Sequence, residues 1–378
     1  MRCYRATPTL LSFRIMSFKL NQKTFSRSQV NQKPSLSFLS NHCYPLQNAS
    51  TRIPRRTASN CISQKREDET ENWTNLNFIR GKKLLSELCT WGIGGPCNYF
   101  VQVSDQTLLA SAIRYCCERC IPFIIVGNGS NCLFDDSGFE GCVILNRIDF
   151  LERIEPGVYR VGSGYQFNRL GVQCTNEGFS GLEFASGIPG TVGGAAYMNA
   201  GANGQETADA IDTVEIVTVD GRHQILYRSD LAFGYRMSPF QAMQDLAAIV
   251  AVTFCLLPSA SAKERQQAYL KKRRLSQPVG ERTAGSVFRN PPGMGISAGE
   301  LIEKAGLKGF RVGSAEVSKV HANFFINTGS SNSREMLELI GLVKAKVKKK
   351  FGIQLQEEIQ YVGPFCKYSR DKDKLEIC

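Results

Sequence analysis

The sequence predicts an α+β protein with a glycine-rich first region and a compact C-terminal domain that begins near residue 270. Strand-like and helix-like patterns alternate from Leu84 onward, which indicates a mixed architecture. Two segments of unusual glycine density interrupt these patterns in the first region. A charged helical stretch that ends before Pro278 then leads into the C-terminal region, and we interpret it as the hinge between domains.

In the first region, residues 101–131 predict a strand, a helix, a second strand and a glycine-rich loop in that order. The helix has Ser104 or Asp105 as its N-cap and ends before the next proline. Asp220-Gly221 is typical of a hairpin turn. Further strands are predicted by three runs of β-branched and apolar residues, at 159–164, 212–221 and 247–257.

The C-terminal region predicts helices and strands that alternate. The predicted helices cover 262–278, 297–306 and 333–352, and the predicted strands cover 322–328 and 353–363. The last helix carries an apolar stripe at helical spacing, made of Met336, Ile340, Val343, Val347 and Phe351. The basic run at 344–350 lies mainly on the opposite face, where we expect a solvated surface and not a nucleic-acid site.

The formal net charge of +12 belongs entirely to the N-terminal segment. Residues 1–66 contain twelve Lys or Arg and no acidic residue, whereas the remainder carries 34 of each sign, so we expect no nucleic-acid partner. The segment is rich in serine and has no long apolar core, as in organelle transit peptides. We therefore expect a disordered transit peptide over 1–66. Its serine content favours the plastid (chloroplast) stroma over the mitochondrion, and the alternative is a tail without a targeting role.

The chain has 14 cysteines and no apolar run long enough to span a membrane. Cys116, Cys117 and Cys120 continue the helical spacing of Leu109 and Ile113, which favours a buried stripe. No second cysteine pair or nearby histidine completes a zinc site. We expect no metal and free, mostly buried thiols in a reducing compartment.

Two segments, 127–131 and 181–204, have the glycine density of anion-binding loops. Glycine lets consecutive backbone N–H groups converge on a phosphate, because it adopts positive φ and permits a close approach. The first is not a Rossmann fingerprint, since Cys132 stands where the third glycine is required, and neither continues as a P-loop. The residues alone predict a dinucleotide-phosphate binder outside the Rossmann class. The alternative is a pair of ordinary tight turns.

Ser286 follows a small-residue turn in RTAGSVFRNP, residues 282–291, and no histidine is near it in sequence. An ordinary turn or helix-cap serine is one interpretation. No G-x-S-x-G motif surrounds it, which argues against a nucleophile elbow. A Ser-His-Asp triad that uses His223 or His321 stays open, although nothing in the sequence favours it.

Together these segments resemble the UDP-N-acetylenolpyruvoylglucosamine reductase family, flavoenzymes of peptidoglycan precursor synthesis and cell wall biogenesis. The resemblance covers roughly residues 84–363. It rests on motifs that occur in the family's order, namely TWGIGGP, GNGSN, GLEFASGIPGTVGGAAYMNAGANG, FGYRMS, AGSVFRNP, AGELIEKAGLKG, EVSKVHANFFIN and LQEEIQYVG.

The resemblance implies an FAD-binding domain of the vanillyl-alcohol-oxidase (PCMH) type over 84–259, with two lobes at about 84–147 and 148–259. A smaller α+β substrate-binding domain would follow over 270–365, and then a tail over 366–378. Only 49 residues separate Arg236 from Ser286, as in the form of the family without a lid loop. The implied cofactor-binding residues are Gly127, Asn128, Gly129, Ser130, Asn131, Gly187, Ile188, Pro189, Gly190, Thr191, Gly193, Gly194 and Asn199.

The family reaction implies roles for three residues. NADPH passes hydride to FAD, and hydride then passes from flavin N5 to the enolpyruvyl C3 of the UDP-sugar, giving UDP-N-acetylmuramate. The resemblance assigns Arg236 to the developing oxyanion and Ser286 to the proton for C2, with Glu358 sharing the negative charge. The strand pattern alone would place Glu358 on a solvated face and Glu357 inward.

The resemblance also implies substrate-binding residues, Asn290, Arg274 and Asn323. Arg273, Arg274 and Gln277 either reach the diphosphate of the substrate or lie at a solvated helix end. We expect a monomer whose partners are NADPH and the UDP-sugar. Two other functions stay open: a flavin oxidase or dehydrogenase of the same fold that acts on another small substrate, and a flavin-binding protein without catalysis.

Overall fold

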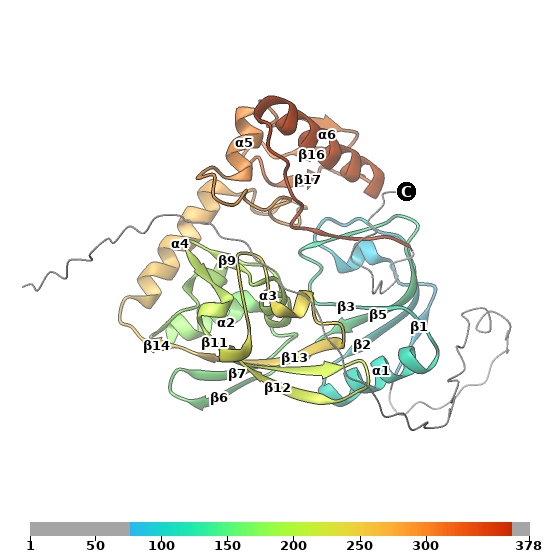
Figure 1. The fold of residues 1–378 in the computed structure, drawn as a ribbon, viewed down its shortest axis with the longest axis vertical. Coiled ribbons are helices and arrows are strands. Elements are labelled where there is room, and N and C mark those ends of the chain that lie inside the picture. Colours follow the sequence, from blue (N-terminus) through green and yellow to red (C-terminus); the bar gives the residue numbers. More distant parts are fainter. Residues whose placement is uncertain (1–75, 365–378) are drawn as a thin grey trace, which may run out of the picture. The chain divides into compact units, whose positions relative to one another are not determined.

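The computed structural model of the chain describes residues 76–364 (Figure 1). The transit peptide predicted for 1–66 and the tail predicted for 366–378 therefore lie outside the described residues. The described chain forms a four-stranded sheet in the order β1-β2-β5-β3, a five-stranded sheet in the order β12-β11-β13-β7-β6 and a three-stranded sheet in the order β15-β16-β17. Helices pack on all three, so the predicted α+β class is confirmed.

The first sheet consists of β1 (Ile79–Arg80), β2 (Cys97–Val103), β5 (Phe139–Asn146) and β3 (Phe123–Val126). The last three run parallel, which requires a crossover, and α1 (Gln106–Glu118) provides it between β2 and β3. The Asp105 carboxylate accepts a hydrogen bond from the Leu108 N–H, so Asp105 is the N-cap of α1. Leu109, Ile113 and Cys116 bury the inner face of α1 against the strands.

The prediction that Cys117 and Cys120 share the buried stripe of α1 is wrong. Cys116 is fully buried, whereas Cys117 and Cys120 are exposed. The helix ends at Glu118 and Cys120 has φ +53°, so the helical spacing does not continue to that residue. Between residues 76 and 364 every cysteine is free, and no three His, Cys, Asp or Glu residues are grouped as metal ligands.

The second sheet is antiparallel throughout. Its strands are β12 (His223–Tyr227), β11 (Ile211–Thr218), β13 (Leu246–Cys255), β7 (Val158–Gly162) and β6 (Leu151–Glu155). The hairpin predicted at Asp220-Gly221 joins β11 to β12, and Gly221 has φ +83°. Helices α2 (Phe167–Asn176) and α3 (Val192–Met198) cover one face of this sheet and share its apolar core (Figure 1).

Several short elements connect the larger strands and helices. Two small antiparallel pairs are β9 (Gly201–Ala202) with β10 (Gln205–Glu206), and β8 (Phe179–Ser180) with β14 (Leu257–Pro258). The 3₁₀ helices are η2 (Leu85–Leu88), η3 (Glu183–Gly187), η4 (Thr207–Asp209), η5 (Arg228–Asp230) and η6 (Pro239–Gln241). Two of them, η3 and η4, flank the glycine-dense segment 187–204 and position its ends.

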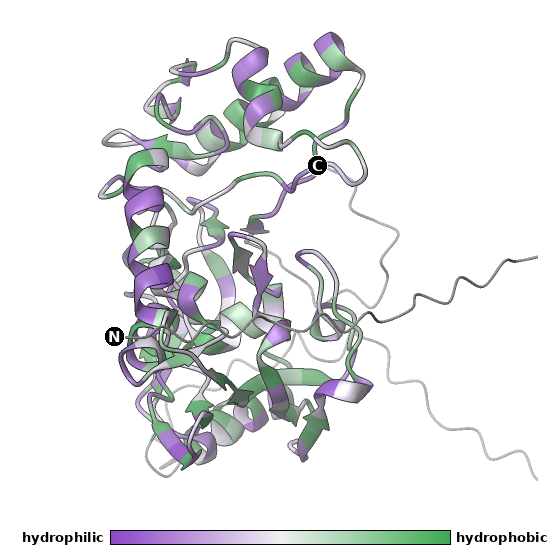
Figure 2. Cartoon of the chain, turned by 90° about the vertical axis from the view of Figure 1, so that its left-hand side faces the viewer, coloured by the Kyte–Doolittle hydropathy of each residue, from purple (hydrophilic) through white to green (hydrophobic). Residues whose placement is uncertain are grey.

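Helix α4 (Ala262–Ser276) leads into the C-terminal domain, and Figure 2 shows it as predominantly hydrophilic. The domain then contains α5 (Ala298–Lys304), β15 (Arg311–Val312), β16 (Ala315–Val317), β17 (Phe325–Asn327) and α6 (Ser333–Phe351). Asn332 caps α6 through the Glu335 N–H, and Gly352 ends it with φ +72°. The predicted stripe of α6 is buried in the domain core, except that Phe351 is half-buried.

The end of the described chain returns to the first sheet's lobe. Strand β18 (Gln360–Val362) pairs in parallel with β4 (Cys132–Phe134), which follows the GNGSN loop directly. The strand predicted over 353–363 is therefore regular only in its last part. A second link to the same lobe runs through the Trp91 indole N–H, which donates to the Phe325 carbonyl at 2.8 Å. Among the described helices, none is both long and apolar enough to cross a membrane.

Candidate active site

The two glycine-rich loops predicted to bind phosphate are in contact. The Ser130 hydroxyl donates to the Pro189 carbonyl at 3.0 Å, which joins the GNGSN loop to the GIPGT segment. Gly127 packs directly on Thr191, since a Cβ at Gly127 would lie 2.5 Å from the Thr191 Oγ1. Segments separated by about 60 residues in the sequence thus form one backbone surface.

The GNGSN loop has donors to offer and a conformation that needs glycine. Within the described part of the chain, the backbone N–H groups of Asn128, Gly129 and Ser130 have no acceptor. Gly129 has φ +56°, and a Cβ there would lie 2.0 Å from the Leu88 carbonyl oxygen. Neighbouring free N–H groups beside a positive-φ glycine form the concave surface that binds phosphate.

Gly193 has a different function from the loop glycines. A Cβ at this position would lie 2.8 Å from the Ser163 Cβ, so Gly193 allows α3 to pack closely on the turn after β7. The Thr191 Oγ1 caps α3 by accepting from the Gly194 N–H at 3.4 Å. These contacts fix the end of the GIPGT segment, at the buried Thr191, against the turn after β7.

A short turn places Arg236 in a strained conformation. The N–H and carbonyl groups of Gly234 and Met237 bond to each other at 3.0 and 2.9 Å, which closes a four-residue turn. Arg236 is the third residue of this turn and has φ +54°. A non-glycine residue in the left-handed region costs about 1–2 kcal/mol, and such strain is concentrated at functional sites.

The Asn199 side chain supports this turn, and Asn199 is completely buried. Its side-chain amide donates to the Gly234 carbonyl at 2.8 Å and to the Glu206 carboxylate at 2.7 Å, and its Oδ1 accepts from the Ala208 N–H. All three hydrogen bonds involve protein groups. In the structure the Asn199 side chain bonds to the Arg236 turn, and the contact with the cofactor that the resemblance implies stays a prediction.

Arg236 and Glu358 form a nearly buried ion pair. The Arg236 Nε donates to the Glu358 Oε1 at 2.6 Å, and the two side chains are 17% and 14% exposed. The Arg236 guanidinium also donates to the carbonyls of Gly201 and Asn199, at 2.8 and 3.4 Å. Three of its five N–H groups are thus used, which leaves two for a ligand.

Burial raises the pKa of the Glu358 carboxyl, although Arg236 and Arg289 nearby act in the opposite direction. The expectation from the strand pattern that Glu358 faces solvent is wrong. The regular strand begins only at Gln360, so alternation does not apply at Glu358, and Glu357 is the residue that bonds to Lys344 near the surface. The Asn131 side chain donates to the Glu358 carbonyl at 3.0 Å and so ties the phosphate loop to the ion pair.

Ser286 lies on an extended segment between two others. It forms an antiparallel bridge with Phe324, and the next residue, Val287, accepts a hydrogen bond from the Glu358 N–H at 2.8 Å. The half-buried Ser286 hydroxyl has no hydrogen-bond partner among the described residues. Neither His223 nor His321 bonds to it: His223 pairs with Glu215, and His321 accepts from the Asn323 N–H. Within residues 76–364, neither histidine therefore forms a Ser-His-Asp triad with Ser286.

The three residues implied to bind substrate are placed very differently. Asn323 is buried, and its amide bonds to both the N–H and the carbonyl of Phe288, at 3.0 and 2.8 Å, so it fixes the Ser286 segment. Asn290 is exposed; its Oδ1 accepts from the Ala298 N–H, and its own N–H donates to the hydroxyl of Tyr235, beside Arg236. Arg274 is exposed on α4. Asn323 thus positions the site, whereas Asn290 and Arg274 remain accessible to a ligand.

Several buried polar atoms around the loops have no partner in the described chain. They include Ser186 Oγ, Gln205 Oε1, Gln277 Oε1 and Arg289 Nε. Buried polar groups in native proteins are nearly always paired, and unpaired ones indicate a missing ligand or water. Together with the open N–H groups of the GNGSN loop, they provide polar groups to which a ligand or water can bind.

Comparison with known proteins agrees with this arrangement. The FAD binding domain family matches residues 97–227, and the family described as UDP-N-acetylenolpyruvoylglucosamine reductase, C-terminal domain, matches 277–362. The UDP-N-acetylenolpyruvoylglucosamine reductase of Protochlamydia amoebophila is 50% identical over 279 residues, which cover 74% of this chain and 92% of the relative. That of Chlamydia felis is 45% identical over 284 residues, or 75% and 94%. The crystal structure of the Thermus caldophilus enzyme has a TM-score of 0.63 and 32% identity, covering 76% of this chain and 98% of that one.

Proposed function

The chain belongs to the UDP-N-acetylenolpyruvoylglucosamine reductase family, and on this premise we propose how its residues carry out the reduction. It is an FAD-binding oxidoreductase that acts on a small molecule. The proposed reaction converts UDP-N-acetylglucosamine enolpyruvate to UDP-N-acetylmuramate with NADPH as the reductant. The observation that carries the proposal is the convergence of Arg236, Glu358 and the Ser286 segment beside the phosphate loop.

FAD would be held mainly by backbone groups. The free N–H groups at Asn128–Ser130 and the adjoining GIPGT segment would bind its diphosphate. When bound, FAD would supply the redox chemistry, accepting hydride from NADPH and delivering it to the enolpyruvyl C3. The GNGSN loop requires glycine at two positions, because a Cβ at Gly127 would clash with Thr191 and one at Gly129 with the Leu88 carbonyl.

Arg236 would bind the carboxylate of the enolpyruvyl group. That carboxylate is conjugated to the double bond, so negative charge develops on it as C3 is reduced. The two unused N–H groups of the guanidinium can donate to it as a fork, and the fixed positive charge stabilises the enolate. The turn conformation and the Gly201 carbonyl fix the guanidinium before substrate binds.

Ser286 would deliver the proton to C2. The enolate carbon is strongly basic, so a serine hydroxyl is acidic enough to protonate it and needs no histidine. Position matters more than acidity here, and the bridge to Phe324 and the Asn323 bonds to Phe288 fix the segment. The hydroxyl has no competing partner in the described chain.

Glu358 would share the charge that forms on the enolate. Burial raises the pKa of its carboxyl, which favours the protonated form that can donate a hydrogen bond. In this form it also leaves Arg236 free to pair with the substrate carboxylate. The chain would follow the form of the family without a lid loop, since η6, β13, β14 and α4 occupy most of the sequence between Arg236 and Ser286.

We further propose that the enzyme acts as a monomer in the plastid stroma, after removal of the serine-rich N-terminal segment. The support is the composition of residues 1–66, which carry all of the net positive charge. Expression of the full chain with a C-terminal fluorescent tag tests this proposal. Plastid fluorescence and a shortened protein are expected, and mitochondrial fluorescence would contradict the assignment.

A two-step flavin experiment tests the reaction. The purified full-length chain is bleached anaerobically with NADPH, and UDP-N-acetylglucosamine enolpyruvate is then added. Rapid return of the flavin absorbance is expected for the native chain and for Ser229→Ala, an exposed serine outside the site. In Ser286→Ala, NADPH should still bleach the flavin, but addition of the substrate should no longer restore its absorbance. Bleaching without any return in the native chain would overturn the substrate assignment.

A further inference from the structure

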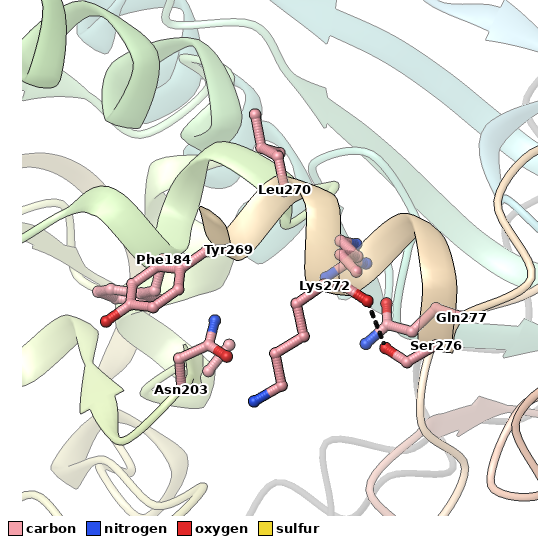
Figure 3. A pocket seen from close by; sticks show the side chains of 10 residues that line it. Phe184, Asn203, Tyr269, Leu270, Lys272, Ser276 and Gln277 are labelled. Carbon is pink, nitrogen blue, oxygen red and sulfur yellow. Dashed lines mark hydrogen bonds between the residues drawn. The ribbon is translucent and has the colours of Figure 1, made fainter. Parts of the chain in front are cut away.

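The cavity between α4, η3 and the β9–β10 hairpin borders the segment predicted to bind the cofactor, because Gly187 lines it (Figure 3). A group of thiols lies elsewhere in the described chain, at the C-terminal end of α1. Cys117 and Cys120 are exposed there, whereas the adjacent Cys116 is fully buried. Within residues 76–364, neither exposed thiol bonds to the loops or to the side chains of the proposed site.

The end of α1 brings the two exposed cysteines together. The Ile121 N–H donates to the Cys116 carbonyl at 2.8 Å. The Cys120 N–H donates to the Cys117 carbonyl at 3.2 Å, and the two bonds form the Schellman motif of a helix C-terminus. Residues joined in this way across a turn have Cα atoms less than about 7 Å apart, and a disulfide needs a Cα separation of about 4.4–6.8 Å. The backbone therefore gives Cys117 and Cys120 a spacing that a disulfide can bridge.

Cys120 occupies a position where a helix end usually has glycine. It follows the C-cap, Arg119, and has φ +53°. Glycine is favoured there because a side chain in the left-handed region is strained. Among the other described non-glycine residues with positive φ, Asn199 and Asn203 are of a type that tolerates it, and Arg236 belongs to the proposed site. Cysteine is not such a type, so the strain at Cys120 indicates a function for its thiol.

The two thiols have different surroundings. The Cys117 S–H donates to the carbonyl of Val219, which directly follows β11, at 3.6 Å. Partial burial raises the pKa of the Cys117 thiol, and the neighbouring thiols and Glu118 act in the same direction. The Cys120 thiol has no hydrogen-bond partner within residues 76–364. Because the thiolate is the nucleophile, these surroundings favour Cys120 as the thiol that reacts first.

We propose that Cys117 and Cys120 form a reversible dithiol–disulfide pair, a redox-sensitive modification site that does not depend on the proposed function. The oxidant is a small-molecule disulfide. Cys120 loses its proton to solvent and attacks one sulfur of this disulfide, which expels one thiolate. Cys117 then loses its proton and attacks the Cys120 sulfur, which expels the second thiolate. The two cysteines are oxidised to one disulfide, and the external disulfide is reduced to two thiols, each of which takes up a proton.

Oxidation changes a contact between α1 and the second sheet. In the disulfide, Cys117 has no S–H to donate, so its hydrogen bond to the Val219 carbonyl is lost. The apolar core that α1 shares with Val217 and Val250 of this sheet does not involve either exposed thiol and stays in place. The effect is therefore expected at the hairpin that joins β11 to β12. In a reducing compartment such a disulfide is transient, as is usual for redox-sensing thiols.

The test exposes the reduced, purified full chain to glutathione disulfide, alkylates the remaining thiols and locates disulfides by tandem mass spectrometry. Trypsin cleaves after Arg119, between the two cysteines, so their disulfide appears as a linked pair of peptides. The link is expected in the native chain and in Cys255→Ser, which removes an exposed thiol elsewhere, and dithiothreitol should reverse it. Cys117→Ser should stop at a glutathione adduct on Cys120. Cys120→Ser should form the adduct on Cys117 several-fold more slowly.

Three results would overturn the proposal: two separate glutathione adducts without a link, no modification of either cysteine, or a link from either one to a third cysteine. Hydrogen exchange over residues 219–222 should become about twofold faster or more in the oxidised chain, from the loss of one hydrogen bond. An unchanged rate would contradict the effect on the hairpin.

Thermal unfolding of Cys120→Gly separates a function of the thiol from a structural role. Glycine relieves the left-handed strain, so this variant should unfold at the same or a higher temperature than the native chain. A lower unfolding temperature would show that the Cys120 side chain supports the fold, which contradicts the argument from strain. Flavin bleaching by NADPH in Cys117→Ser should match that of the native chain, so failure of the disulfide would leave the proposed function standing.

Discussion

The proposed phosphate loop presents backbone N–H groups, whereas the neighbouring cluster proposed for catalysis presents side chains from three separate segments. In the loop, Asn128, Gly129 and Ser130 keep their donors open, and the glycines leave no space for a Cβ. In the cluster, Arg236 and Glu358 are bonded to each other before any substrate is present. Substitutions that add atoms should therefore disturb the loop most, whereas substitutions that remove side-chain atoms should disturb the cluster most. Each prediction below uses this difference.

Removal of the Ser286 hydroxyl should have the largest effect. Ser286→Ala is expected to slow the substrate-dependent step by about 10²–10⁴-fold, the usual contribution of a positioned proton donor. FAD affinity should stay within about twofold of the native value, because the loops are unchanged. Stopped-flow kinetics of the two half-reactions measures both. An equal loss in the NADPH step would show that Ser286 supports the fold of the site and not proton transfer.

Addition of one methyl group to the loop should have the next largest effect. Gly129→Ala meets a positive φ and a backbone oxygen at 2.0 Å, so the loop must shift. We expect FAD affinity to fall about 10–100-fold, which corresponds to about 1–3 kcal/mol of strain. Gly81→Ala is the matched control, since Gly81 has φ +64° and open space around it. Equal FAD affinities for the two variants would contradict the close-packed loop.

Loss of the amide that supports the Arg236 turn should have an intermediate effect. Asn199→Ala removes the hydrogen bonds to Gly234 and Glu206, so the guanidinium loses its fixed orientation. We expect kcat/KM for the UDP-sugar to fall about 10-fold, mainly in kcat, with FAD affinity little changed. A titration of FAD into the apoprotein decides between the two roles. A large loss of FAD affinity would show that Asn199 contributes to cofactor binding.

The smallest effect concerns pH and stability. Burial raises the pKa of Glu358 in the folded state, so folding favours its protonated form. The contribution of Glu358 is therefore greatest below the pKa of the unfolded carboxyl and is lost as pH rises through the folded pKa. Glu358→Gln cannot titrate, so its unfolding temperature relative to the native chain should rise between acidic and neutral pH. A difference that is constant across this range would contradict a raised pKa.

Sequence reasoning located the segments of the site better than the contacts within them. Regular periodicity predicted α1 and α6, because their caps and apolar stripes are local features. It failed at Cys120 and Glu358, where the helix has ended and the strand has not begun. The hydrogen bonds of the Asn199 side chain were not predictable either, because its partners lie up to 35 residues away in the sequence.

Arg273, whose guanidinium has no hydrogen-bond or ion-pair partner within residues 76–364, shows the same limit. In the sequence, Arg273 and Arg274 are equivalent basic residues at the end of a charged helix. Only the packing of α4 on η3 makes one half-buried beside Gly187 and leaves the other exposed. Gly187 is the residue that could have suggested this difference. In the sequence it is recognisable only as one glycine of a loop.

The parallel pairing of β18 with β4 determines the order in which the site is completed. The strand contributed by Gln360–Val362 lies close to the C-terminus, whereas β4 follows the GNGSN loop in the first half of the chain. A ribosome makes the loop some 225 residues before Glu358, whose carbonyl accepts a hydrogen bond from Asn131, and before β18. During synthesis, the earlier part of the chain emerges with its loop unsupported by the later segment. The contacts that support the loop from β18 and from Glu358 therefore form only after these residues have emerged.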